Sequence, residues 1–216
     1  MPIFTSVHRV ALWGALCVVG VVDVGCEPAP AEKETKVSRF NAATKKDAPS
    51  DKAARSFCEQ TFAGGETGVA WRAPVDKALP GPQTFTRPAA QNPGWTWVNL
   101  WATWCRPCVE ELALLDRWQS ALEKDGLPIR VELWSVDDDE GDLAAWLKKH
   151  PMPGTVKWLK GGAADLPAVL GPMQVPANSP IPVHALVDGK GKLRCVRVGA
   201  VHDEDYAAIK AIIAGG

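Results

Sequence analysis

The sequence predicts an α/β domain built on a central mixed β-sheet with helices on both faces and an extra strand segment at its N-terminal side. Three observations support this fold class. Strand-like and helix-like segments alternate after residue 95, which favours parallel strands joined by right-handed crossovers. Residues 95–102, WTWVNLWA, are apolar on both faces, as in a central strand covered on both sides. A C-terminal hairpin adds antiparallel strands.

A helix is predicted directly after the central strand. Pro107 suits the first turn of a helix, where its missing N–H is not needed. The apolar residues that follow have helical spacing, and they stand at positions 108, 112, 115, 118 and 122. Gly126 is expected to end this helix.

The rest of the domain continues the alternation to the end of the chain. Its predicted elements are, in chain order, a strand at 129–136, a helix at 141–150, a strand at 155–160, a helix at 164–171, a hairpin of strands 183–188 and 193–200, and a helix at 203–214. Pro151 stops the second helix, and Asp203 is expected to cap the last one. One or two further strands are expected within residues 56–90.

The N-terminal 55 residues are expected to lie outside this domain. Residues 1–25 are interpreted as a signal peptide, because the uncharged apolar run at 11–22 is shorter than the roughly 20 residues that span a bilayer. The following Gly-Cys resembles a bacterial lipobox and predicts lipidation of Cys26; ordinary cleavage near 28–31 or a short uncleaved anchor are the alternatives. Residues 26–55 are poor in apolar side chains and predict a flexible tether, with the domain at 56–216.

The charge balance argues against one class of partner, and the compartment sets how the cysteines can pair. The 24 basic residues are balanced by 25 acidic ones, so no nucleic-acid partner is expected. The chain of 216 residues is long enough to build a core without disulfide staples. A signal peptide places the domain in the periplasm or on an extracytoplasmic face, in an oxidising compartment. There Cys105 could pair with Cys108, which leaves Cys58 and Cys195 as a second pair by elimination; two buried free thiols are the alternative.

The Cys-x-x-Cys pair fits redox chemistry better than a metal site. A structural zinc ion needs four ligands, and the four histidines show no ligand spacing, although two thiolates alone could bind Cu(I). Cys105 stands where a strand ends and a helix begins, so the helix dipole would favour its thiolate. Cys105 would attack a substrate disulfide, and Cys108, one turn further on the apolar face, would resolve the mixed disulfide. Arg106 adds a positive charge beside the two cysteines, and the Trp104 ring would line the site.

Two segments resemble the thioredoxin superfamily, in particular its TlpA/ResA-like branch of extracytoplasmic thiol–disulfide oxidoreductases. The first is NLWATWCRPCVEE at 99–111. The second, SPIPVHALVDGKGKLRCVRVG at 179–199, resembles the segment in which the family places a cis-proline before the strand that faces the cysteines. Pro182 matches that proline. The resemblance covers about residues 56–214 and implies a thioredoxin-like fold, with Trp104, Arg106, Pro107, Ile181 and Pro182 contacting the substrate.

The same resemblance indicates a role for one glutamate. Thioredoxin has a buried aspartate where this chain has Asn99, which cannot take a proton. In the TlpA/ResA-like branch a glutamate three residues after the second cysteine is implicated instead, and here that residue is Glu111. Positions three apart share a helix face, so Glu111 can lie near Cys108 and act in its deprotonation. Glu110 is interpreted as a surface residue, and His184 as an ordinary strand residue, with a side chain that faces the substrate as the alternative.

The predicted function is that of a membrane-tethered, monomeric thiol–disulfide oxidoreductase whose only redox group is the Cys105–Cys108 disulfide. The resemblance implies that it reduces disulfides of exported proteins, as in cytochrome c maturation, with electrons from a membrane donor. The alternative is a Cu(I)-binding chaperone for metal-centre assembly that uses the same two cysteines. A peroxidase of the peroxiredoxin type is disfavoured, because the pattern around Thr103 does not match that class.

Overall fold

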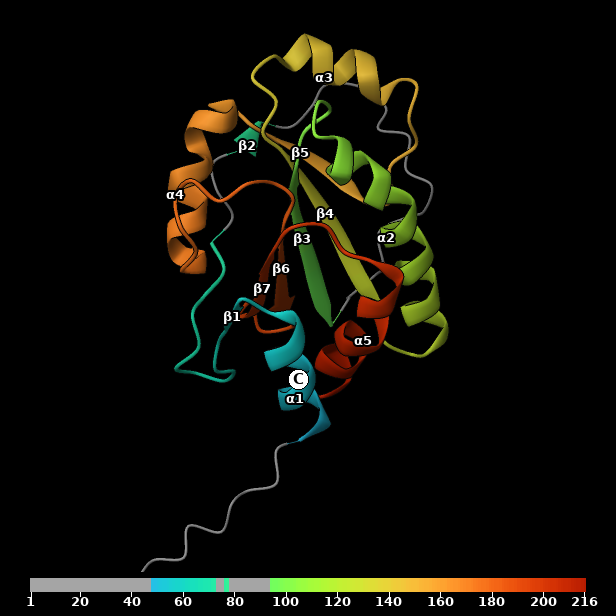
Figure 1. Ribbon diagram of the computed structural model, residues 1–216, viewed down its shortest axis with the longest axis vertical. Coiled ribbons are helices and arrows are strands. Elements are labelled where there is room, and N and C mark those ends of the chain that lie inside the picture. Colours follow the sequence, from blue (N-terminus) through green and yellow to red (C-terminus); the bar gives the residue numbers. More distant parts are fainter. Residues whose placement is uncertain (1–47, 73–75, 78–93) are drawn as a thin grey trace, which may run out of the picture. The chain divides into compact units, whose positions relative to one another are not determined.

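The computed structural model describes residues 48–72, 76–77 and 94–216 (Figure 1). The predicted signal peptide, Cys26 and most of the predicted tether lie outside these residues. None of the helices in the described part is long and apolar enough to cross a membrane.

A seven-stranded sheet forms the centre of the domain, in the order β1-β7-β6-β3-β4-β5-β2. Strands β3, β4 and β5 are parallel neighbours, whereas all other pairs are antiparallel, so the predicted mixed sheet is confirmed. The two short strands that precede β3 lie at opposite edges of the sheet. The strands are β1 Gln60–Thr61, β2 Asp76–Lys77, β3 Trp95–Trp101, β4 Ile129–Ser135, β5 Thr155–Leu159, β6 Val183–Asp188 and β7 Leu193–Val198.

Among the described residues, five α-helices connect and flank these strands, and their order follows the sequence pattern. They are α1 Pro49–Phe57, α2 Arg106–Lys124, α3 Glu140–Leu147, α4 Leu166–Leu170 and α5 Tyr206–Ala214, with 3₁₀ turns at Gly162–Asp165, Gly171–Met173 and Asp203–Asp205. In Figure 1, α2 and α5 lie on one side of the sheet and α4 on the other. Helices on both faces are therefore confirmed.

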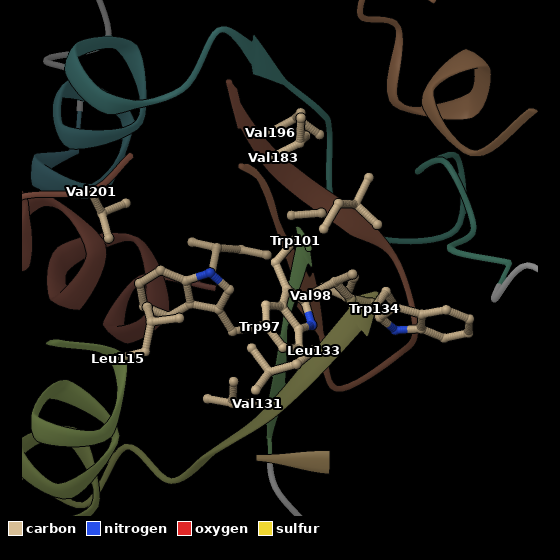
Figure 2. Close-up of a cluster of buried hydrophobic side chains, with 14 of the residues drawn as sticks. Trp97, Val98, Trp101, Leu115, Val131, Leu133, Trp134, Val183, Val196 and Val201 are labelled. Carbon is tan, nitrogen blue, oxygen red and sulfur yellow. The ribbon is translucent and has the colours of Figure 1, made fainter. Parts of the chain in front are cut away.

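The core is built around β3, whose side chains are buried on both faces. Trp97 points toward α2, where its ring lies 6.0 Å from that of Trp118. Side chains alternate along a strand, so Val98 and Leu100 point to the opposite face, and both are fully buried. Figure 2 shows Leu115 of α2 close to the Trp97 ring in this cluster. Burial on both faces is why the segment WTWVNLW lacks the alternation of an exposed strand.

Helix α1 corrects the predicted boundary between tether and domain. It begins at Pro49, within the segment 26–55 that the composition assigned to a flexible tether. The helix packs against α5, with Phe57 buried and Ala53 and Ala54 contacting the core. Only this narrow apolar side is buried, and the polar residues around it concealed the helix in the sequence.

The predicted cap of the last helix is also wrong. Asp203 already belongs to the 3₁₀ turn that leads into α5, and its carboxylate pairs with Arg117 of α2. The extended residue before this turn is His202, whose backbone N–H donates to Asp205 Oδ2 at 2.9 Å. The carboxylate that makes the capping contact is therefore that of Asp205, two residues after Asp203.

Candidate functional site: a redox disulfide with a buried glutamate

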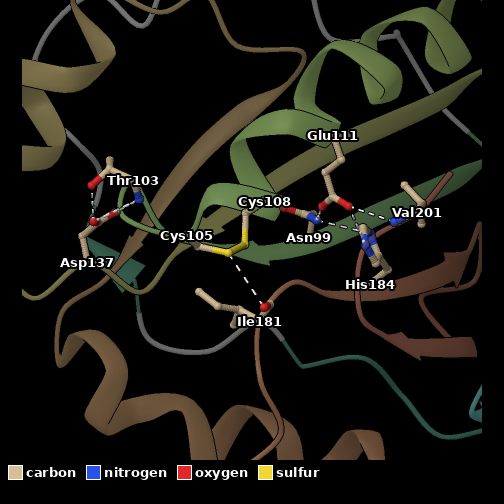
Figure 3. The surroundings of a disulfide bond; sticks show 9 residues. All are labelled: Asn99, Thr103, Cys105, Cys108, Glu111, Asp137, Ile181, His184 and Val201. Atoms are coloured by element: carbon tan, nitrogen blue, oxygen red, sulfur yellow. Dashed lines mark hydrogen bonds and ion pairs between the residues drawn. A yellow bond between two sulfur atoms is a disulfide. The ribbon is translucent and has the colours of Figure 1, made fainter.

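A disulfide joins Cys105 to Cys108 at the point where β3 gives way to α2 (Figure 3). Cys105 is the residue that precedes the first turn of α2, and it is 5% exposed, whereas Cys108 is fully buried inside the first turn. Both cysteines therefore lie at the N-terminal end of a 19-residue helix. Free backbone amides and the helix dipole at such an end favour a thiolate after reduction.

A buried aspartate fixes the turn that carries the cysteines. The Asp137 carboxylate, 3% exposed, accepts hydrogen bonds from the Thr103 backbone N–H at 3.1 Å and the Thr103 hydroxyl at 2.6 Å. It also accepts from the Ser135 hydroxyl at 2.6 Å. These contacts tie the segment before Trp104 to the end of β4. Sequence reasoning missed Asp137; the signal was its place directly after the strand 129–136, as the first of the four consecutive acidic residues 137–140.

The segment before β6 lies against the disulfide. The Ile181–Pro182 peptide bond is cis, at the proline that the family resemblance singled out. The Ile181 carbonyl oxygen lies 3.8 Å from Cys105 Sγ, although the two residues are 76 positions apart in the chain (Figure 3). The structure thus brings Ile181 and Pro182 to the more exposed of the two sulfur atoms.

The other predicted substrate contacts surround the disulfide on the surface. Trp104 is 63% exposed, the one large apolar side chain among the described residues that is so open to solvent. Arg106 and Pro107 are exposed as well. Arg106 Nε lies 2.7 Å from Glu110 Oε1, and this hydrogen bond, with the attraction between the charges, raises the pKa of Arg106. Glu110 is therefore a surface residue, and the Arg106 charge is directed to it.

Glu111 is buried, unlike Glu110. The residue is 3% exposed, and its side chain points from α2 toward the sheet, where Oε1 accepts a hydrogen bond from Asn99 Nδ2 at 2.8 Å. Its Oε2 accepts from the Val201 backbone N–H at 3.0 Å. Glu111 is also among the residues that line a pocket between the first turns of α2 and residues 200–203.

His184 faces Glu111 from β6. It is 1% exposed, and its Nε2 lies 3.4 Å from Glu111 Oε2. Its other nitrogen, Nδ1, accepts a hydrogen bond from Trp97 Nε1 at 3.1 Å and lies 3.2 Å from Asn99 Nδ2. The interpretation of His184 as an ordinary strand residue therefore missed its place beside Glu111. Antiparallel pairing of Asn99 with His184 sets this position, and the sequence does not contain that register.

A second disulfide joins Cys58 to Cys195, the pair that remained by elimination in the sequence. Cys58 follows α1, and Cys195 lies in β7, 137 positions later. Cys195 is buried, with 1% exposure. The bond connects the N-terminal helix to the sheet and takes no part in the arrangement around Cys105. Within the described residues, no cluster of three or more histidine, cysteine, aspartate or glutamate side chains is placed to hold a metal ion.

Comparison with known proteins points to one class of relatives, although no family model matches the chain. The chain is 28% identical over 98 residues to the thiol-disulfide oxidoreductase ResA of Bacillus thuringiensis subsp. konkukian, a match that covers 44% of this chain and 50% of ResA. It is 28% identical over 135 residues to the thiol:disulfide interchange protein DsbE homolog of Paracoccus denitrificans, covering 61% of this chain and 65% of the homolog. The chain is therefore similar to the ResA-type thiol-disulfide oxidoreductases.

This similarity confirms the resemblance stated from the sequence. The chain spans about half the length of the ResA proteins it matches. A crystal structure described as a thiol:disulfide interchange protein DsbE from Chlorobium tepidum aligns with a TM-score of 0.49 at 24% identity, over 69% of this chain and 96% of that one.

Proposed function

We propose that this protein is a thiol–disulfide oxidoreductase that reduces disulfides of exported proteins through Cys105 and Cys108. The observation that carries the proposal is the disulfide at the start of α2, with one sulfur near the surface beside Ile181 and the other buried. The curated relatives named thiol-disulfide oxidoreductase support the same reaction class. The proposal includes the substrates of cytochrome c maturation, as the resemblance implied.

The reaction is a sequence of two thiol–disulfide exchanges. The Cys105 thiolate attacks one sulfur of the substrate disulfide, and the other substrate sulfur leaves as a thiolate. The Cys108 thiolate then attacks the Cys105 sulfur, releases the second substrate sulfur and closes the Cys105–Cys108 disulfide. Two electrons pass to the substrate, whose thiolates take up two protons. A dithiol donor at the membrane would reduce the protein again by the reverse chemistry, itself becoming a disulfide.

The surroundings of the cysteines support this division of roles. Attack requires a sulfur that a protein substrate can reach, and Cys105 is nearer the surface than Cys108. The exposed Trp104 and the segment at Ile181 flank it and would contact the polypeptide around the substrate disulfide. Glu111 would act on Cys108 from the same helix face, one turn further along. Lipidation of Cys26 would hold the monomeric protein on the extracytoplasmic face of the membrane.

Reduction of insulin by dithiothreitol tests the proposal directly. Insulin precipitates when its disulfides are reduced, and the wild-type soluble domain is expected to accelerate precipitation. Cys105→Ala is expected to lower the rate to that of dithiothreitol alone, since the attacking sulfur is gone. The double variant Cys58→Ala/Cys195→Ala is the matched control, because it removes a cysteine pair away from the site; assayed at a temperature at which circular dichroism shows it folded, it should keep the activity. Full activity of Cys105→Ala would overturn the proposal.

A further inference from the structure

The Trp97 indole determines which nitrogen of His184 carries the proton. An indole N–H can only donate, and Trp97 Nε1 points at His184 Nδ1 from 3.1 Å. The Asn99 amide nitrogen, also a donor, lies 3.2 Å from the same atom. Nδ1 is therefore the unprotonated nitrogen, and the proton of the neutral ring lies on Nε2. That nitrogen faces Glu111 Oε2 at 3.4 Å and has no other partner among the described residues.

The Glu111 carboxylate then accepts hydrogen bonds from two donors and faces a third at a longer distance. Asn99 Nδ2 donates to Oε1, while the Val201 backbone N–H and the His184 Nε2–H face Oε2. All four side chains of this group are buried, namely Trp97, Asn99, Glu111 and His184. Each contact has a defined direction, so neither the imidazole nor the carboxylate can turn without losing a partner.

The direction of these contacts decides how the Asn99 amide is turned. Since Nδ2 is directed at Glu111 and His184, the amide oxygen must point the other way. Figure 3 shows this oxygen on the side of Cys108, with the amide between the disulfide and the Glu111 carboxylate. Oδ1 is buried and has no hydrogen-bond partner within the described part of the chain. A buried acceptor without a partner costs free energy, about 1–3 kcal/mol in general.

We propose that His184 and Asn99 are positioning residues of the redox site: the directed contacts from Trp97 through His184 and Glu111 to Asn99 present the Asn99 oxygen to the thiol that Cys108 gains on reduction. The disulfide takes up two electrons and two protons from an external dithiol, which becomes a disulfide. One proton then lies on Cys108 Sγ and can be donated to Asn99 Oδ1. The orphaned oxygen of the oxidised state thus gains a partner, and the reduced state is stabilised.

This inference deepens the proposed function and rests on the same cysteine pair, but it is tested without any substrate protein. The wild-type domain and its variants are equilibrated with mixtures of reduced and oxidised glutathione at pH 7, and the fraction of dithiol is measured by alkylation and mass spectrometry. Asn99→Leu removes both the orphaned acceptor and the thiol's partner. We expect the equilibrium to move about tenfold toward the disulfide.

Variants at His184 test the other end of the chain of contacts. His184→Leu removes the N–H that faces Glu111, and we expect a shift in the same direction of about threefold. His184→Gln retains an amide N–H for Glu111 and an oxygen for Trp97, so its equilibrium should stay within twofold of wild type. His150→Gln is the control for loss of an exposed histidine. Equal values for His184→Leu and His184→Gln, or an unshifted Asn99→Leu, would overturn the proposal.

The tautomer of His184 can be observed in the wild-type protein by NMR. A long-range ¹H–¹⁵N correlation spectrum at pH 7 is expected to show the proton on Nε2, and the signal is assigned by its absence in His184→Gln. A proton on Nδ1 would contradict the inference. If the glutathione equilibria behave as expected while the wild type fails to reduce insulin, the proposed function is wrong and the positioning role stands.

Discussion

The two disulfides of this domain differ in almost every respect that matters to chemistry. Cys105–Cys108 closes a loop across three positions at the open end of a helix, whereas Cys58–Cys195 joins α1 to β7 across 137 positions. The first is flanked by the exposed Trp104 and the Ile181 carbonyl, while the second lies between a helix end and a buried strand. The free energy of unfolding should therefore depend mainly on Cys58–Cys195, whereas thiol–disulfide exchange should depend on Cys105–Cys108.

Removal of each bond by paired alanine substitution tests this division. On the chain-entropy account, a bond across 137 positions stabilises the fold by about 5 kcal/mol, and one across three positions by about 2 kcal/mol. Cys58→Ala/Cys195→Ala should therefore lower the free energy of unfolding more than Cys105→Ala/Cys108→Ala does, as measured by denaturant unfolding. The Cys105→Ala/Cys108→Ala variant truncates two buried cysteines, whereas only Cys195 of the other pair is buried, so cavity formation works against the predicted order and makes it a stricter test. Equal losses would show that burial of the sulfur atoms, and not the length of the closed loop, determines their contribution.

The same contrast explains what the sequence could and could not predict. The redox pair was predictable from local pattern, because strand, Cys-x-x-Cys and helix follow one another within residues 95–124. The partner of Cys58 followed only from counting. Helix α1 was missed because its residues are mostly polar and its buried side exists only against α5. Composition describes such a segment as a tether until the surface that covers it is known.

The residues around the redox pair show a similar limit. Glu111 was predicted from the family resemblance, and its spacing to Cys108 within one helix, which is a local relation, supported the prediction. His184 and Asp137 reach the site through strand pairing and through the ends of neighbouring parallel strands. A shift of the register by one position would turn His184 to the other face of the sheet. Such contacts depend on the fold as a whole, and they are where sequence reasoning failed.

Substitution of Trp104 should affect exchange and leave stability unchanged, the reverse of the expectation for Cys58 and Cys195. The ring is 63% exposed, so little of its surface stabilises the fold, but a bound polypeptide would cover it. Trp104→Ala is expected to lower kcat/KM for insulin reduction about tenfold, mainly through KM, without a change in the melting temperature. Trp104→Phe should retain most of the activity. A fall in melting temperature with unchanged kinetics would assign the ring to the fold.

The smallest effect is expected where α2 and α5 are joined by charge instead of sulfur. Lys210 Nζ lies 2.7 Å from Asp125 Oδ2, and the Tyr206 hydroxyl donates to the same oxygen at 3.3 Å. The hydrogen bond from Lys210 is the largest cause that lowers the pKa of Asp125 in the folded protein. A carboxyl whose folded pKa is lowered contributes stability above its unfolded value, about 3.9, and loses it as the pH falls through the folded pKa.

Lys210→Met should therefore destabilise the domain slightly at pH 7 and leave its stability at pH 2 equal to that of the wild type. Both side chains are more than one third exposed, so solvent screening keeps the effect small. Thermal unfolding of wild type and variant across this pH range measures it, and added salt should reduce the difference at pH 7. The stabilisation by a covalent bond such as Cys58–Cys195 depends neither on pH nor on salt in this way. If the loss in Lys210→Met persisted at pH 2, Lys210 would stabilise α5 through the packing of its methylene groups, and the two helices would not be joined by charge.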